Sequence, residues 1–163
     1  MQYRLEPMMP DARTAVIDIF NYFVENSFAA YFGVKVNYRL FDRFLMMIGD
    51  YPSLVVKTET GEIVGFGFIH PYHPADSFGR TAEVTYFILP DHTGKGLGKQ
   101  MLDHFEAEAR KRGIEIFLAS ISSLNDGSIR FHRQRGFIEC GRFKRIGCKK
   151  GLDFDMVWMQ KTL

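Results

Sequence analysis

The segment Glu83–Lys99, EVTYFILPDHTGKGLGK, constrains this chain more than any other part of its sequence. A β-rich apolar run ends at Pro90 and leads, through three alternating glycines, into a segment of helical character. Gly94, Gly96 and Gly98 have no Cβ, so a ligand can come within hydrogen-bonding distance of their backbone N–H groups. Such groups are also the unpaired donors of a helix N-terminus, which favours negative charge. The segment predicts a strand, a glycine turn and a helix that together bind the pyrophosphate of a nucleotide-like cofactor.

Two common phosphate-binding motifs do not fit this turn. A P-loop needs Gly-x4-Gly-Lys-Ser/Thr, and no window of the sequence supplies it. A dinucleotide fingerprint would place its third glycine at Lys99, and it would need an acidic residue after the next strand, which instead ends near Ser120. For the turn taken alone, a glycine-rich loop without a ligand remains the alternative.

The residues around the turn resemble the coenzyme A-binding motif of GNAT-type N-acetyltransferases, Arg/Gln-x-x-Gly-x-Gly/Ala. Gly96 and Gly98 fall at its two glycines, and Thr93 stands at the Arg/Gln position. The stretch Asn125–Phe137 resembles the second motif of that family, in which an Asn and a short helix precede a Gly-Phe pair. Two further stretches are similar to the branch of phosphinothricin and methionine sulfone acetyltransferases: Asn21–Ser27 and Gly147–Asp155.

The resemblance runs nearly end to end and implies one N-acetyltransferase domain over residues 1–163. The implied fold is α/β (α+β), with a central mixed, mostly antiparallel twisted sheet flanked by helices. The implied activity is transfer of an acetyl group from acetyl-CoA to the primary amine of a small molecule, amino-acid-like or other, by direct attack. Two alternatives stay open: a non-catalytic acetyl-CoA-binding sensor, and an acetyltransferase of a protein N-terminus or lysine. The resemblance also implies a homodimer.

Composition is consistent with a small enzyme. A chain of 163 residues with 46% hydrophobic content fits one domain with a proper core, and its 16 Phe and 7 Tyr indicate an aromatic core or an aromatic-lined pocket. No apolar run approaches ~18 residues and the N-terminus lacks the apolar segment of a signal peptide, so we expect a cytoplasmic protein without a membrane partner. Cys140 and Cys148 lack metal spacing, and we expect them reduced and the protein free of metal.

Apolar spacing and turn residues predict four helices and seven strands. The first helix opens at Pro10-Asp11 and buries Val16, Ile19, Phe20 and Phe23. The other helices are expected over Asn37–Ile48, Gly96–Arg112 and Asp126–Gln134. The strands are expected over Tyr3–Pro7, Ser53–Thr58, Glu62–His70, Thr81–Leu89, Ile114–Ser120, Phe137–Phe143 and Phe154–Gln160.

Positive charge gathers between Arg130 and Lys150, where eight basic residues accompany one acid, Glu139. One interpretation is a solvated basic surface. A second is attraction of the polyanionic cofactor through the summed field. A nucleic-acid surface is the third, but the segment is predicted to be a helix followed by strands without a binding motif, so we expect no nucleic-acid partner.

Acetyl transfer requires the acceptor amine to lose a proton, and the departing thiolate benefits from an acid. Glu83 is the predicted base, because it lies on the strand that leads into the turn and falls at the glutamate of the resembling branch. His132 is the predicted acid, at a position where the resembling enzymes carry a tyrosine or histidine near the sulfur, and its unperturbed pKa lies far below that of a phenol. The alternatives are a surface glutamate on a strand and a surface histidine on a helix.

The resemblance also implies the cofactor contacts. Backbone groups of Tyr86, Phe87 and Ile88 would hold the pantetheine arm like an added strand, where this strand parts from its neighbour. The pyrophosphate would lie on Thr93, Gly94, Lys95, Gly96, Leu97, Gly98 and Lys99. Asn125 and Ser128 would contact the arm or the adenosine end, and a helix cap is the other role for Asn125.

The acceptor side is the least defined part of the sequence. Phe28, Phe78 and Arg80 are the predicted acceptor contacts. The resembling branch has Arg and Tyr in the loop before the base strand, at positions that here are Ala75 and Phe78. Because Ala75 cannot pair with a carboxylate, an uncharged or cationic amine is favoured as the acceptor.

Overall fold

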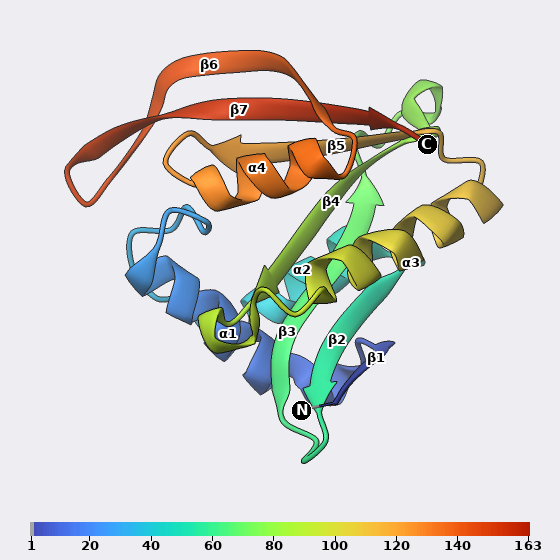
Figure 1. Cartoon of the computed structure of the whole chain (residues 1–163), viewed down its shortest axis with the longest axis vertical. Coiled ribbons are helices and arrows are strands. Elements are labelled where there is room, and N and C mark those ends of the chain that lie inside the picture. Colours follow the sequence, from blue (N-terminus) through green and yellow to red (C-terminus); the bar gives the residue numbers. More distant parts are fainter. Residues whose placement is uncertain (1) are drawn as a thin grey trace.

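The computed structural model describes residues 2–163, which form a seven-stranded sheet covered by helices (Figure 1). The strands are β1 (Tyr3–Pro7), β2 (Ser53–Thr58), β3 (Ile63–Pro71), β4 (Thr81–Ile88), β5 (Ile116–Ser122), β6 (Ile138–Lys149) and β7 (Leu152–Thr162). The helices are α1 (Arg13–Asn26), α2 (Leu40–Ile48), α3 (Leu97–Lys111) and α4 (Asp126–Gln134). A short 3₁₀ turn, Pro10–Ala12, precedes α1.

The strand order is β1-β2-β3-β4-β5-β7-β6, and every neighbouring pair is antiparallel except β4 and β5. The parallel pairing is short: it joins Thr81–Glu83 to Ile116–Leu118, although β4 continues to Ile88. Beyond Glu83 the two strands diverge, which is visible in Figure 1. The predicted mixed, mostly antiparallel sheet and the predicted splay of the central strand are both confirmed.

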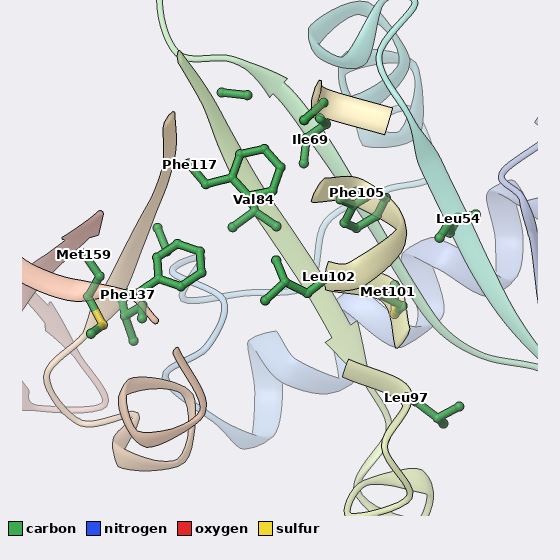
Figure 2. Close-up of a cluster of buried hydrophobic side chains, with 14 of the residues drawn as sticks. Leu54, Ile69, Val84, Leu97, Met101, Leu102, Phe105, Phe117, Phe137 and Met159 are labelled. Carbon is green, nitrogen blue, oxygen red and sulfur yellow. The ribbon is translucent and has the colours of Figure 1, made fainter. Parts of the chain in front are cut away.

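Two hydrophobic cores lie on opposite faces of the sheet. Successive side chains of a strand point to opposite faces, so Leu54 and Val56 of β2 join the core under α3, whereas Val55 joins the core under α1 and α2. Figure 2 shows the first core, where Met101, Leu102 and other α3 side chains meet strand side chains from the sheet. The packing fixes α3 and α4 on one face and α1 and α2 on the other.

Helix α3 positions the glycine turn. It begins after Gly96, whose φ of +78° is accessible to glycine at little cost. Its buried residues recur at helical spacing and anchor it to the sheet: Leu97, Met101, Leu102, Phe105, Glu106 and Ala109. The chain leaves the helix through Gly113, with φ of +75°. The strand, turn and helix predicted for this segment are confirmed.

The predicted boundaries hold to within about three residues except on β6. That strand was expected to end at Phe143 but continues to Lys149, because its pairing with β7 resumes after an irregularity between Phe143 and Gly147. Lys150 and Gly151 then turn the chain with φ of +52° and +73°, as a two-residue hairpin requires. Helix α2 starts at Leu40 rather than Asn37, since residues 37–39 form hydrogen-bonded turns instead of helix.

Within the described residues, no helix is long and apolar enough to cross a membrane. Cys140 and Cys148 are both exposed and unbridged. The same residues include no cluster of three His, Cys, Asp or Glu side chains placed to hold a metal ion.

Candidate active site

The divergence of β4 from β5 leaves an opening in the sheet that two cavities share. The smaller, of about 250 Å³, lies around Glu83, and the larger, of about 630 Å³, lies along the end of β4 and the glycine turn. Both cavities are lined by the residues at their junction: Ala29, Tyr86, Phe87, Asn125 and Ser128. A ligand in one cavity can therefore extend into the other.

The larger cavity gathers the residues predicted to bind the cofactor. All but Lys95 line it: Tyr86, Phe87, Ile88, Thr93, Gly94, Gly96, Leu97, Gly98, Lys99, Asn125 and Ser128. The ammonium group of Lys95 is turned away, because it donates to the Tyr3 hydroxyl at 2.9 Å and to the Asp91 carbonyl at 2.8 Å. Asn125 has the alternative role as well, since its Oδ1 accepts from the Ser128 amide and caps α4.

The geometry of this cavity fits an anionic ligand. Gly94 and Gly96 have φ of +71° and +78°, and a Cβ on Gly98 would approach the Phe131 ring to 3.3 Å. The first amides of α3 are free to bind an anion at the positive end of the helix. Arg135 also lines the cavity, and among the described residues its Nε is a buried side-chain nitrogen without a hydrogen-bond partner. A buried donor without a partner calls for an explanation, and a phosphate group would supply the missing acceptor.

Three neighbouring strands place Glu83. The Oε1 atom of Glu83 accepts a hydrogen bond of 2.9 Å from the Ser120 hydroxyl on β5. Across the antiparallel pair, His70 of β3 lies opposite Glu83, and its Nε2 is 3.8 Å from Oε2. The His70 Nδ1 donates to the Pro71 carbonyl at 2.9 Å, because a carbonyl can only accept. In the neutral imidazole Nε2 is thus an acceptor that faces the Glu83 carboxylate, which is also an acceptor. The N–H groups of an ammonium or the O–H groups of a water can bridge the two.

His132 is buried on α4 and hydrogen-bonded at both ring nitrogens. Its Nδ1 donates to the Ser128 carbonyl at 2.7 Å, so Nε2 accepts the Tyr86 O–H, with an O···N distance of 2.5 Å. Burial lowers the pKa of His132 to about 4, although the bond to the Ser128 carbonyl partly opposes this. Burial also raises the pKa of Tyr86 well above its usual value.

At neutral pH, then, both His132 and Tyr86 are uncharged. The prediction that His132 is a direct proton donor needs revision, because its Nε2 carries no proton in this state. The proton of the pair lies on the Tyr86 hydroxyl, which His132 orients.

Aromatic side chains form the wall of the smaller cavity: Phe20, Tyr31, Phe32, Phe44 and Phe68, together with Met47. Tyr31 donates to the Ser120 carbonyl at 3.1 Å, and burial, with a further contribution from the Glu83 charge, raises the pKa of Tyr31 to about 12. The sequence did not single out these residues or the contacts of His70 and Ser120. Only the richness in aromatic residues hinted at such a pocket.

Comparison with known proteins decides the family. The sequence model described as the acetyltransferase (GNAT) family matches residues 18–137. The chain belongs to the GNAT acetyltransferase family. The predicted family and the predicted class of enzyme, an N-acetyltransferase, are therefore confirmed.

Relatives within the family agree with this assignment. The chain is 35% identical over 113 residues to an L-methionine sulfoximine/L-methionine sulfone acetyltransferase of Pseudomonas paraeruginosa, a match over 69% of this chain and 66% of that protein. It is 34% identical over 116 residues to an L-amino acid N-acyltransferase of Escherichia coli, a match over 71% of this chain and 67% of that protein. The matches thus span about two thirds of each relative's length.

A solved structure extends the likeness to the whole chain. It is a GNAT superfamily phosphinothricin acetyltransferase from Sinorhizobium meliloti in complex with acetyl-CoA. The TM-score is 0.92 at 25% identity, with 100% of this chain and 89% of that chain covered. The described residues therefore form one GNAT-fold domain, which confirms the predicted fold class.

In this GNAT domain the three predicted acceptor residues do not line either cavity. Phe78 lies in the loop before β4, where its ring packs on His73 with centroids 4.8 Å apart. Arg80 pairs with Glu115 at 3.6 Å on the surface. Phe28 packs toward Phe154 of β7 instead of the cavity. Each side chain has a partner that the sequence could not reveal, because the partner comes from a distant segment or from the fold of the loop.

Within the GNAT domain, four of the eight basic residues in the segment Arg130–Lys150 pair with carboxylates of the described residues: Arg133, Arg142, Lys144 and Arg145. On the β6–β7 hairpin, Arg142 and Lys144 pair with Asp155, and Arg145 pairs with Asp153. Arg135 differs, since it lines the larger cavity. The first interpretation, a solvated basic surface, thus fits the residues that form surface ion pairs. The second, attraction of the cofactor, fits Arg135, which lines the cavity of the predicted cofactor residues.

Proposed function

We propose that this GNAT protein transfers the acetyl group of acetyl-CoA to the primary amine of a small molecule by direct attack. The observation that carries the proposal is the position of Glu83, whose carboxylate lies at the opening between β4 and β5 beside the cavity of the predicted cofactor residues. Bound acetyl-CoA would supply a thioester, which an uncharged amine can attack. The protein must bind that group, deprotonate the amine and exclude water.

The residues of the larger cavity are suited to hold acetyl-CoA. The amides at the start of α3, with Lys99 and Arg135 nearby, favour the pyrophosphate. The edge of β4 beyond Glu83 has no β5 partner, so its backbone groups are available to the amide-containing arm. Asn125 and Ser128 lie at the junction and can contact the same arm.

Glu83 would take the first proton from the acceptor's ammonium group, because an ammonium has no lone pair. Ser120 holds one oxygen of Glu83, and His70 lies beside the other, where it can share the proton. The nitrogen loses its second proton as the amide forms, and the departing thiolate takes up one. We assign the Tyr86 hydroxyl to the leaving-group side: it would give the thiolate the proton that it otherwise donates to His132, as that hydrogen bond opens, and the proton lost by the nitrogen would restore the hydroxyl.

The acceptor is proposed to be a small primary amine. The relatives are named for amino-acid substrates, so amino-acid-like amines belong in the first test. A protein substrate must bring part of its chain to the proposed base and needs an open groove, whereas the cavity at Glu83 holds only about 250 Å³. The small cavity thus favours a small molecule over a protein N-terminus or lysine.

We also propose a cytoplasmic homodimer. Strand β6 is the last strand of the sheet and exposes large apolar side chains at Ile138, Phe143 and Ile146. Such an edge is commonly covered by a partner. The free cysteines are consistent with a reducing compartment.

The variant Glu83→Gln tests the proposed base, because it keeps the shape and removes the carboxylate. We expect kcat/KM for thiol release to fall by about 10²–10⁴-fold and the acid limb of the pH–rate profile to disappear. Affinity for acetyl-CoA, measured by calorimetry, should not change. Glu115→Gln is the matched control, because Glu115 lies on the surface beside Arg80. An unchanged rate and profile in Glu83→Gln would refute the role of this carboxylate.

A further inference from the structure

The smaller cavity has an unusual balance of charge. Among the described residues that line it, Glu83 carries the one side chain that is charged at neutral pH. No lysine or arginine is among these lining residues, and the buried His132 is neutral there. The acceptor site thus offers one negative group and no positive group.

Two basic side chains lie close to this site and already have hydrogen-bond partners. The ammonium group of Lys149 donates to the carbonyls of Ser27 and Ala30 at 2.6 Å each, and thereby holds the loop behind the wall. His70 lies beside Glu83, and its Nδ1 is bonded to the Pro71 carbonyl. Neither group is placed to bind a second anion in the cavity.

Much of the remaining wall is aromatic and tightly packed, and the polar side chains that complete it carry no charge: Tyr31, Thr85, Ser120, Ser122, Asn125 and Ser128. Phe44 packs against Phe20 with ring centroids 5.5 Å apart and against Phe68 at 5.4 Å. Phe32 extends the same group of rings, 5.9 Å from Phe20. Aromatic surfaces of this kind favour an aromatic or branched aliphatic body on the ligand.

These observations select between two kinds of amine. A primary ammonium group would be attracted to Glu83, and the rest of an apolar amine would bury against the rings. An α-amino acid would bring its carboxylate, close to its amine, into a site without a cation and beside a like charge. Burying an unpaired carboxylate is strongly unfavourable, and repulsion from Glu83 adds to the cost.

We infer that the acceptor is a primary amine on an aromatic or branched aliphatic body that lacks an α-carboxylate. The inference rests on the proposed acetyltransferase function and names the substrate class of that site. It sets this chain apart from the relatives whose names specify amino acids.

Matched amines that differ only in the carboxylate test the inference. Thiol release from acetyl-CoA is measured with phenethylamine against L-phenylalanine, and with 3-methylbutylamine against L-leucine. We expect kcat/KM to be at least tenfold higher for each amine than for its amino acid. L-phenylalaninamide, which has similar bulk but no carboxylate, should behave like phenethylamine, and this separates charge from size.

The variant Met47→Arg provides a second measurement. Met47 lines the cavity and is 40% exposed, so an arginine can be accommodated at the rim. The ratio of kcat/KM for phenethylamine to kcat/KM for L-phenylalanine should fall severalfold in Met47→Arg, because the arginine can pair with the carboxylate. The ratio should stay unchanged in Met47→Leu.

Equal or better turnover of the amino acids by the unmodified protein would overturn the inference and leave the acetyltransferase function standing. Absence of thiol release with every amine, despite binding of acetyl-CoA, would overturn the proposed function and the inference together. The two failures are distinguishable, because the first shows activity and the second shows none.

Discussion

The buried His132 should make the free energy of unfolding depend on pH. In the folded protein burial lowers its pKa to about 4, whereas an unfolded chain has a histidine pKa near 6.5. Between these values the unfolded state binds more protons, so the free energy of unfolding decreases as the pH falls. The difference between the two pKa values corresponds to about 3 kcal/mol of stability at ~1.4 kcal/mol per pKa unit. This contribution to the free energy of unfolding is fully present above pH ~6.5 and lost by pH ~4.

Urea denaturation between pH 4 and 7.5 measures this dependence. The variant His132→Gln removes the titrating group, so the part of the slope that comes from His132 should disappear, whatever its effect on stability at pH 7. His104→Gln is the matched control, because His104 is exposed on α3, and it should retain the slope of the unmodified protein. If His132→Gln and the unmodified protein lose the same free energy over this range, His132 is not held neutral by burial, and its assignment as an orienting group is wrong.

Two further variants probe the cofactor turn and the loop behind the acceptor cavity. Gly96→Asp should weaken acetyl-CoA binding at least tenfold by calorimetry, whereas Gly113→Asp, at a similar φ but outside the cavity, should bind normally; equal affinities would contradict the anion site. Lys149→Met should lower the free energy of unfolding by about 1–3 kcal/mol, because two buried carbonyls of residues 27–30 lose their donor, and it should raise KM for the amine. Lys144→Met removes an exposed ion pair and should change neither the free energy of unfolding nor KM for the amine. A similar loss of stability in that variant would contradict the stabilising role of the Lys149 hydrogen bonds.

The strand, turn and helix of the proposed cofactor site could be predicted because they are local. Strand, glycine turn and helix N-terminus follow one another within Glu83–Lys99, so the sequence specifies both the elements and their order. The backbone itself supplies the donors, and glycine is needed where φ is positive. Arg135 was predicted only as one of eight basic residues that could attract the cofactor, because its approach to the turn depends on how α4 packs beside α3.

The acceptor side could not be predicted because the positions of its side chains depend on the register of three paired strands. His70, Glu83 and Ser120 come from three strands, and a shift of one residue in either pairing would separate them. The prediction of an acceptor contact in the loop before β4 rested on closeness in sequence, which did not bring the side chain into either cavity. Phe78 is close to the base in sequence, but the loop folds on itself and packs that ring on His73.

His132 shows the same limit for electrostatics. The sequence supplies an imidazole with an ordinary pKa and a place on α4, and both suggested an acid. Burial to 3% exposure and the bond to the Ser128 carbonyl are tertiary properties, and together they fix the proton on Nδ1 and leave Nε2 as an acceptor. His132 stays a predicted site residue, and its proposed role changes from proton donor to orienting group.

The splay of β4 from β5 is the reason that one ligand can contact both halves of the site. Glu83 and Tyr86 are three residues apart on β4, so their side chains point to opposite faces of the sheet. In a continuous sheet the neighbouring strand would separate the base from the Tyr86–His132 pair. Because pairing with β5 ends at Glu83, both cavities open onto the same gap, and both are lined by Tyr86. If the proposed roles of Glu83 and Tyr86 are right, the end of this three-residue parallel ladder is what allows deprotonation of the amine and departure of the thiol in one bound complex.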